Sequence, residues 1–176
     1  MLNWRWGIAA LAMTVLATPA AAQTGFANMV DHIHLGVPDP AQGVAWYRDH
    51  FAGAPMTEGP DRLMFGETRM IFQRTEKPVP SSGCVLDHLG FSVADLDATM
   101  RKFEAEGVKI VQPARDVAGL FKLAFIEDPW GTRIEVVQDP QKLGLHHVHL
   151  RGPDAAATLA WYVDKFGGSI GKLKDR

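Results

Sequence analysis

The sequence has little cysteine, no long hydrophobic run and no cluster of charge of one sign. Cys84 is the single cysteine among 176 residues, so no disulfide bond can form within the chain, even in an oxidising compartment. The formal net charge is −2, and there is neither a basic block nor an acidic tail, which argues against nucleic acid as a partner. With 47% hydrophobic and 22% charged residues, the composition is typical of a soluble globular protein with one good core.

The N-terminus carries an apolar run that is too short to cross a membrane. GIAALAMTVLA spans 11 residues, whereas a bilayer requires roughly 20. Arg5 precedes this run and Ala-Ala-Ala-Gln follows it, an order that favours a secretory signal peptide over a membrane anchor or a cytosolic helix. We expect residues 1–22 to be removed between Ala22 and Gln23, which predicts a periplasmic or secreted protein without stable membrane insertion after processing. The absence of a twin Arg favours the Sec route.

The chain repeats a histidine-bearing segment. Residues 30–53 align without a gap with 145–168, and 12 of the 24 aligned positions are identical. His32 corresponds to His147 in that alignment, and a looser copy places His88 at the same position. Three such starts, spaced roughly 57 residues apart, indicate an internal duplication.

Each copy predicts the same succession of elements. His32 and His34 alternate with apolar residues, as in a half-buried strand, and Asp39 then provides an N-cap followed by a proline at the first helical position. In the second copy Asp95 caps a helix that Gly107 closes, and three β-prone segments follow. The pattern therefore predicts an α+β fold of paired βαβββ modules.

The linkers divide the chain. We expect a domain over residues 23–140, made of one unit at 28–75 and a second at 86–140, separated by TEKPVPSSGC. We name these unit one and unit two. Residues 145–176, unit three, contain only a predicted strand and helix, so we interpret them as the incomplete start of a second domain, in a fragment of a longer protein.

The paired units resemble the vicinal oxygen chelate superfamily, which includes glyoxalase I, extradiol dioxygenases, fosfomycin-resistance proteins and bleomycin-binding proteins. The segments that carry the resemblance are DHIHLGV, DHLGFSV and AFIEDPWGTRIEVV. The resemblance implies two units whose sheets curve around a cleft, and a divalent metal ion, Fe, Mn, Zn, Co or Ni, held by residues of the first and last strands.

Carried over by position, the resemblance implies His32, His88 and Glu135 as metal ligands. The sequence is compatible with this, because His88 and Glu135 each alternate with apolar neighbours and therefore point away from the apolar side of their strands. Two imidazoles and a carboxylate can bind a divalent metal and leave positions open for substrate. The fourth family position falls within residues 69–73, which contain no carboxylate, and this departs from a four-ligand glyoxalase I site.

The remaining histidines receive lesser roles. His34 shares the face of His32 and is a candidate general base or substrate contact. His50 and His146 are interpreted as surface residues. His147 repeats His32 but is expected to lack ligand partners in this chain.

These residues imply a metal-dependent enzyme, of glyoxalase or dioxygenase type, that binds a small substrate through two vicinal oxygens. Lyase, isomerase and extradiol-type dioxygenase chemistry all stay open. The alternative is a non-catalytic binding protein of the bleomycin-resistance kind, which would need no metal. A third interpretation is a scaffold that acts only as a homo-oligomer, with unit three pairing across chains.

Overall fold

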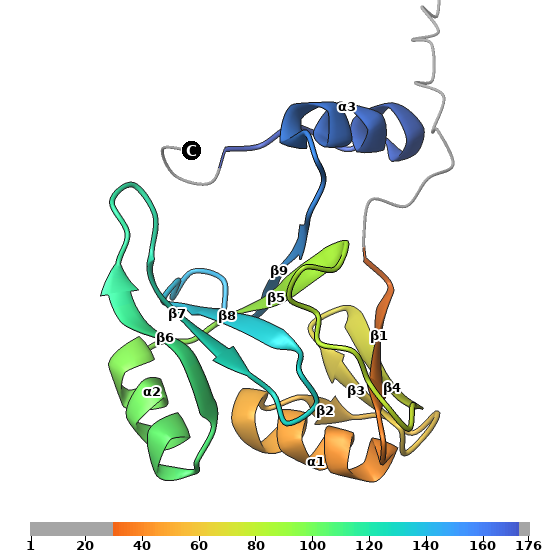
Figure 1. Ribbon diagram of the computed structural model, residues 1–176, viewed down its shortest axis with the longest axis vertical. Helices are drawn as coiled ribbons and strands as arrows, with labels where there is room; N and C mark the ends of the chain where they lie inside the picture. The colour runs from red at the N-terminus through yellow and green to blue at the C-terminus, as the bar shows by residue number, and fades with distance from the viewer. Residues whose placement is uncertain (1–29, 173–176) are drawn as a thin grey trace, which may run out of the picture.

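A computed structural model describes residues 30–172, and the predicted signal peptide at 1–22 lies outside them. Unit one comprises β1 (His32–Val37), α1 (Pro40–Phe51), β2 (Ala54–Pro55), β3 (Arg62–Phe65) and β4 (Thr68–Arg74). Unit two comprises β5 (Leu86–Ser92), α2 (Leu96–Ala105), β6 (Lys109–Asp116), β7 (Lys122–Glu127) and β8 (Arg133–Val137). Unit three contributes β9 (Gly144–Leu150) and α3 (Ala155–Phe166). The predicted α+β fold of βαβββ modules is confirmed (Figure 1).

The two complete units have the same strand order. Unit one forms a four-stranded sheet, β1-β4-β3-β2, in which β1 runs parallel to β4. Unit two repeats this order as β5-β8-β7-β6, again with a parallel first and last strand. In each unit, therefore, the first strand lies beside the last, which brings their side chains onto a common sheet face.

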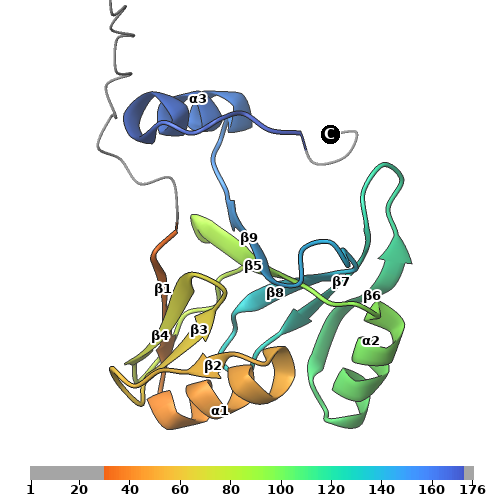
Figure 2. The same ribbon diagram turned by 180° about the vertical axis from the view of Figure 1, so that it is seen from behind.

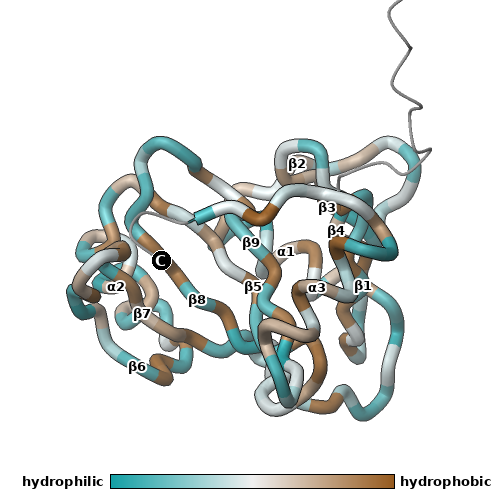
Figure 3. The backbone as a smooth tube through the Cα atoms, turned by 90° about the horizontal axis from the view of Figure 1, so that it is seen from above, coloured by the Kyte–Doolittle hydropathy of each residue, from teal (hydrophilic) through white to brown (hydrophobic). Residues whose placement is uncertain are grey.

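Unit three joins the sheet of unit two. Strand β9 pairs antiparallel with β5 and extends that sheet to five strands, β6-β7-β8-β5-β9. Seen from above, β5 and β9 run between the other strands of unit two and the sheet of unit one (Figure 3). The first strand of unit three is thus built into unit two, whereas α3 stands apart from both sheets (Figures 1 and 2).

The helices begin as the sequence predicts. Asp39, Asp95 and Asp154 each accept a hydrogen bond at Oδ1 from a backbone N–H in the first turn of their helix. This satisfies one of the N–H groups that a helix start leaves without a partner. Gly107 follows the last turn of α2 with φ +74°, a left-handed conformation that suits glycine. None of the helices in residues 30–172 has the length and hydropathy that crossing a bilayer requires.

One hydrophobic core connects units one and two. Phe51 of α1 stacks on Phe91 of β5, with ring centroids 4.2 Å apart, and Phe65 meets the same ring edge-on. Tyr47 is fully buried and donates a hydrogen bond to Asp128 Oδ2, in the turn between β7 and β8, at 2.9 Å. Unit one thus packs against one face of β5 and of the β7–β8 hairpin. The opposite face of these strands remains available for a site.

Candidate metal centre

The candidate site is a cleft lined by side chains of β5, β7, β8 and β9, in which a carboxylate oxygen lies between two imidazoles. Glu135, on β8, places Oε2 3.0 Å from Nε2 of His147 on β9 and 3.4 Å from Nε2 of His88 on β5. The parallel pairing of β5 with β8 and the antiparallel pairing of β5 with β9 bring these three strands side by side. The three side chains therefore converge from residues that are far apart in the sequence.

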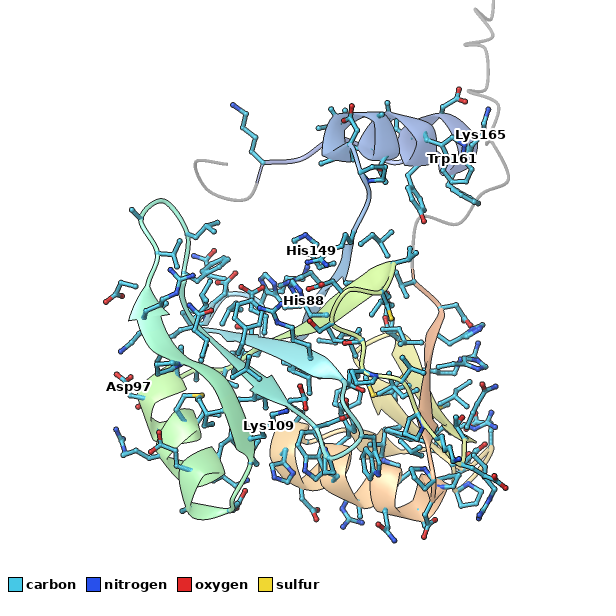
Figure 4. All side chains as sticks on the ribbon, viewed as in Figure 1. His88, Asp97, Lys109, His149, Trp161 and Lys165 are labelled. Atoms are coloured by element: carbon cyan, nitrogen blue, oxygen red, sulfur yellow. The ribbon has the colours of Figure 1, made fainter. Side chains whose placement is uncertain are left out.

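These separations match those of ligands around one metal ion. With metal–ligand distances of about 2.1 Å, two ligand atoms are about 3.0 Å apart for a right angle at the metal and about 3.4 Å apart for a tetrahedral one. His149 adds a further imidazole, because the ligand atoms of His88, His147 and His149 lie within 4.8 Å of one another. His88 and His149 lie close together above the sheet of unit two (Figure 4). Three imidazoles and a carboxylate suit the divalent transition metals.

His88 is held in an orientation that leaves one ring nitrogen available. Its Nδ1 lies 2.9 Å from Oδ1 of Asp87, a buried carboxylate that also has Arg151 at 3.3 Å. With the proton on Nδ1, the lone pair of Nε2 points toward Glu135. This Nε2 atom is buried and makes no hydrogen bond of acceptable geometry. A buried ring nitrogen without a partner is costly unless a ligand completes it, so the site fits a metal ion.

His147 has a comparable support through a second imidazole. Its Nδ1 lies 2.8 Å from Nδ1 of His146, whose Nε2 is 3.4 Å from Oδ2 of Asp139. If Asp139 accepts from His146, then His147 donates to His146 and keeps Nε2 unprotonated on the side of Glu135. The backbone allows this approach because Gly90 lies opposite His147, where an added Cβ would be 2.1 Å from Cε1 of the imidazole.

A β-bulge explains why two consecutive histidines act together. Gly90 pairs with His147 and Phe91 pairs with Leu145, so His146 is an extra residue in the ladder. At such a bulge, strict alternation of side chains between the two sheet faces is interrupted. Both imidazoles therefore line the same cavity. The interpretation of His146 as a surface residue is wrong, since only 6% of it is exposed.

The charges of the cluster favour an added cation. Burial by itself raises the pKa of Glu135, but in the metal-free protein His147 and His88, when their Nε2 atoms carry protons that face the carboxylate, outweigh it and lower the pKa to about 2. Burial lowers the pKa of His88, and this effect is exceeded by Glu135 and Asp87, which raise it. Glu135 is thus ionised at neutral pH and attracts positive charge, whether a proton on an imidazole or a metal ion.

The structure brings two of the three predicted ligands together. His88 and Glu135 share the cleft, whereas His32 lies on β1 in the other sheet, half exposed, with its Nδ1 2.6 Å from Asp31. The physical reason is that β9, not β1, pairs with the free edge of β5. His34, the candidate base, lies beside His32 with ring centroids 4.8 Å apart and is exposed as well.

The register identifies the position in unit one that corresponds to Glu135. Gly90 of β5 pairs with Glu135, and His34, which occupies the same place in β1, pairs with Ile71. Unit one therefore carries an isoleucine where unit two carries the carboxylate. Among residues 30–172, the one group of three histidine, cysteine or acidic side chains whose ligand atoms all lie within 4.8 Å of one another is His88, His147 and His149, and Glu135 Oε2 adjoins two of these histidines.

Sequence reasoning missed the part that unit three plays. The expectation that His147 lacks partners is wrong, because its Nε2 lies 3.0 Å from Glu135. The repeat itself was the available signal, since it assigns His147 to the same strand position as His88. The contributions of His149 and Asp139 had no signal in the sequence, because each depends on how β9 pairs with β5. Asp87, in contrast, directly precedes His88 in the DHLGFSV segment.

A larger cavity, of about 600 Å³, lies away from these histidines, between α1 and the start of β6. Its charged groups already have partners, and two ion pairs lie within its lining. His50 Nε2 is 3.4 Å from Glu106, and Lys109 Nζ is 2.5 Å from Glu127. We therefore place the candidate site in the smaller cavity beside Glu135.

The comparisons with known proteins agree with the fold. The sequence model of the Glyoxalase/Bleomycin resistance protein/Dioxygenase superfamily matches residues 29–136, which is 108 of the 176 residues. The chain belongs to this superfamily. No curated protein matches the sequence.

Solved structures show how far the superfamily fold extends along this chain. Glyoxalase I from Zea mays superposes with a TM-score of 0.63 at 21% identity, over 76% of this chain and 53% of the maize chain. This chain thus spans about half the length of the maize enzyme. A mutant of the fosfomycin resistance protein FosX from Listeria monocytogenes, complexed with Mn(II) and 1S,2S-dihydroxypropylphosphonic acid, superposes with a TM-score of 0.55 at 16% identity, over 64% of this chain and 92% of that one.

Proposed function

We propose that this chain is a metal-dependent enzyme that binds a small substrate through two adjacent oxygens. The observation that carries the proposal is the position of Glu135 Oε2, 3.0 and 3.4 Å from Nε2 of two histidines on neighbouring strands. His88, Glu135 and His147 would hold the ion, with His149 as a further ligand. This set takes His147 in place of His32. The superposition with FosX, which was solved with Mn(II) and a diol, supports the same class of site.

The residues of the chain would divide the work in a simple way. Asp87 orients His88, and the pair of Asp139 and His146 orients His147. Glu135 supplies negative charge, which makes the site selective for a cation. When bound, a divalent ion acts as a Lewis acid that stabilises negative charge developing on a substrate oxygen. The proposal covers lyase, isomerase and extradiol-type dioxygenase reactions. Each of these needs either stabilisation of negative charge on a substrate oxygen or binding of the substrate to the metal through its oxygens.

Metal binding is the test that decides between this proposal and a binding protein. The full chain, purified without an affinity tag and stripped with a chelator, is titrated with Mn(II), Fe(II), Co(II), Ni(II) and Zn(II) by calorimetry. We expect one equivalent of at least one metal to bind. Glu135→Gln and His147→Ala should weaken binding by about 100-fold or more, and His32→Ala should leave it unchanged.

Two outcomes would contradict the proposal. If none of the five metals binds, a metal-free ligand-binding role is the better account. If His32→Ala weakens binding while His147→Ala does not, the site lies between units one and two rather than between units two and three. Thermal unfolding of each variant, followed by circular dichroism, establishes that the loss is local.

We also propose that the protein is exported, and the support for this is the sequence of residues 1–22 alone. Expression of the full chain in a bacterial host, followed by mass spectrometry of the periplasmic fraction, should give a mature N-terminus at Gln23. Recovery of the unprocessed chain from the cytosol would contradict export.

A further inference from the structure

The cavity beside Glu135 has two chemically different ends. It encloses about 480 Å³, and the histidines and Glu135 occupy one end. The wall beyond them is apolar. It is formed by Val117, Leu120, Phe121, Leu123, Phe125 and Val137.

This apolar wall is not part of the core that supports the fold. Along β7, Ala124 and Ile126 pack into the main core, whereas Leu123 and Phe125 belong to a separate buried cluster on the cleft face, with Phe121 and Val137. If this face of β7 and β8 served only the fold, it would carry polar residues, because it does not pack on the main core. Here that face is apolar next to a group of charged ligands, which is the usual composition of a small-molecule site.

Phe125 links the two ends of the cavity. It pairs in register with Glu135, and its ring meets that of His88 edge-on, with centroids 5.3 Å apart. The guanidinium of Arg133 lies 4.2 Å from the ring centroid and holds the ring from another side. The ring of Phe125 therefore lies where it would contact a bound small molecule, next to the oxygens that the molecule presents to the metal.

The cavity is large enough to hold an aromatic ligand. A cavity of about 150 Å³ is enough to hold benzene. The 480 Å³ available here holds an aromatic ring together with a short chelating group. Among the described residues that line the cavity, Arg115 is the one basic side chain apart from the histidines, and Glu135 is the one acid. Arg115 and a bound divalent ion together outweigh the charge of Glu135, so an anionic ligand is favoured over a cationic one.

We infer, on the basis of the proposed metal site, that the substrate is a small anion with two adjacent oxygens and an aryl-sized apolar substituent. The oxygens, such as the hydroxyl and carboxylate of a 2-hydroxy acid, occupy the histidine end. The apolar substituent lies against Phe125, Leu123 and Val137. The apolar wall thus determines which of many chelating compounds the site accepts.

The test compares two ligands that chelate alike and differ in their substituent. Mandelate and lactate are both 2-hydroxy acids, with a phenyl group in one where the other has a methyl group. Each is titrated into the full chain loaded with Co(II), and the visible absorption of the metal reports binding. We expect mandelate to bind at least about tenfold more tightly, because its ring leaves water for the apolar wall.

A pair of near-isosteric variants locates the preference. Val137→Thr places a hydroxyl in the apolar wall and should lower the preference for mandelate severalfold, with lactate affinity unchanged. Val111→Thr, at an exposed valine on β6, is the matched control and should leave both affinities unchanged. Melting temperatures of both variants exclude a general loss of folding.

The outcomes separate this inference from the proposed function. Equal affinities for mandelate and lactate in a chain that retains Co(II) would overturn the inference and leave the metal site standing. Retention of none of the five metals would overturn both, and if the chain retains another of them but not Co(II), the same titrations are followed by calorimetry with that metal. Mandelate binding that calorimetry finds to be the same with and without Co(II) would also overturn the inference, since chelation would then play no part.

Discussion

Units one and three have closely similar sequences, yet the structure places them in very different surroundings. Strand β1 of unit one lies against β4 of its own unit, with His32 half exposed beside Asp31. Strand β9 of unit three lies against β5, and the corresponding His147 is beside Glu135. The same histidine in the same kind of strand is therefore a candidate ligand in one unit and a surface residue in the other. The neighbouring strand makes the difference.

The helices of the two units differ in the same sense. Tyr47 of α1 is fully buried under the sheets, whereas the corresponding Tyr162 of α3 is 38% exposed. Trp161 and Phe166 of α3 are exposed as well, and none of the described residues of α3 is buried. Sequence similarity predicts that both helices form, but burial requires a sheet beneath the helix, which α3 lacks within residues 30–172.

The largest expected effect concerns the close approach of β9 to β5. Gly90→Ala would place a Cβ 2.1 Å from the His147 ring, so the imidazole must move away from Glu135. We expect metal affinity, measured by calorimetry, to fall by about 100-fold or more. Gly36→Ala makes the same change on β1, where the new Cβ meets the side chain of Thr75, and should leave affinity unchanged. An unchanged affinity in Gly90→Ala would show that His147 does not bind the metal.

A smaller effect is expected from the aspartates that precede two equivalent histidines. Asp87→Asn replaces the carboxylate that keeps the proton of His88 on Nδ1 with a neutral amide that can also donate to Nδ1, and should lower metal affinity by about 10- to 100-fold. Asp31 contacts His32 in the same way, so Asp31→Asn is the matched control and should have no effect on metal affinity. Equal losses of metal affinity in both variants would mean that His32 and His88 contribute equally to metal binding. The measurement is competition with a chromophoric chelator.

The smallest effect concerns the two tyrosines. Tyr47→Phe removes the hydrogen bond to Asp128 and should lower the free energy of unfolding by about 1 kcal/mol, whereas Tyr162→Phe should change it little. Chemical denaturation at several pH values provides the measurement. Similar losses in the two variants would contradict the difference in burial.

The pH dependence of the Tyr47→Phe variant follows from Asp128. Burial raises the pKa of Asp128, and hydrogen bonds, including that from Tyr47, oppose the rise. Without the tyrosine hydroxyl the pKa in the folded state increases further above that in the unfolded chain. The folded variant then binds the proton more tightly, so its stability falls as the pH rises from the ordinary aspartate range through the folded pKa. The loss should therefore be larger at neutral pH than in acid.

Most of the fold could be predicted from the sequence because its signals are local. Asp39 and Asp95 mark helix starts through hydrogen bonds to neighbouring N–H groups, and alternation of apolar residues marks the strands. The repeat then predicts that units one and two have the same architecture. The division into domains at residues 140–145 stays a prediction, and β9 pairs directly with a strand of unit two.

The site could be predicted only in part because its geometry depends on pairing between distant strands. His88 and Glu135 belong to one unit, so the repeat and the superfamily resemblance were enough to bring them together. The choice between His32 and His147 as their partner depends on whether β1 or β9 pairs with β5, and two strands of such similar sequence give no local signal for that choice. His146 escaped prediction because a bulge breaks the alternation on which the assignment of faces relies.

The extra residue in β9 has a consequence for insertions and deletions. Because His146 has no counterpart in β5, deleting it would shorten the strand without removing a rung of the ladder. The shortened strand would be free to pair evenly with β5, and the regular zigzag of its side chains would then be restored. His147 would lose the neighbouring ring that fixes its proton, although its own place opposite Gly90 would be kept. Loss of one amino acid would thus change which ring nitrogen of an unaltered histidine carries the proton.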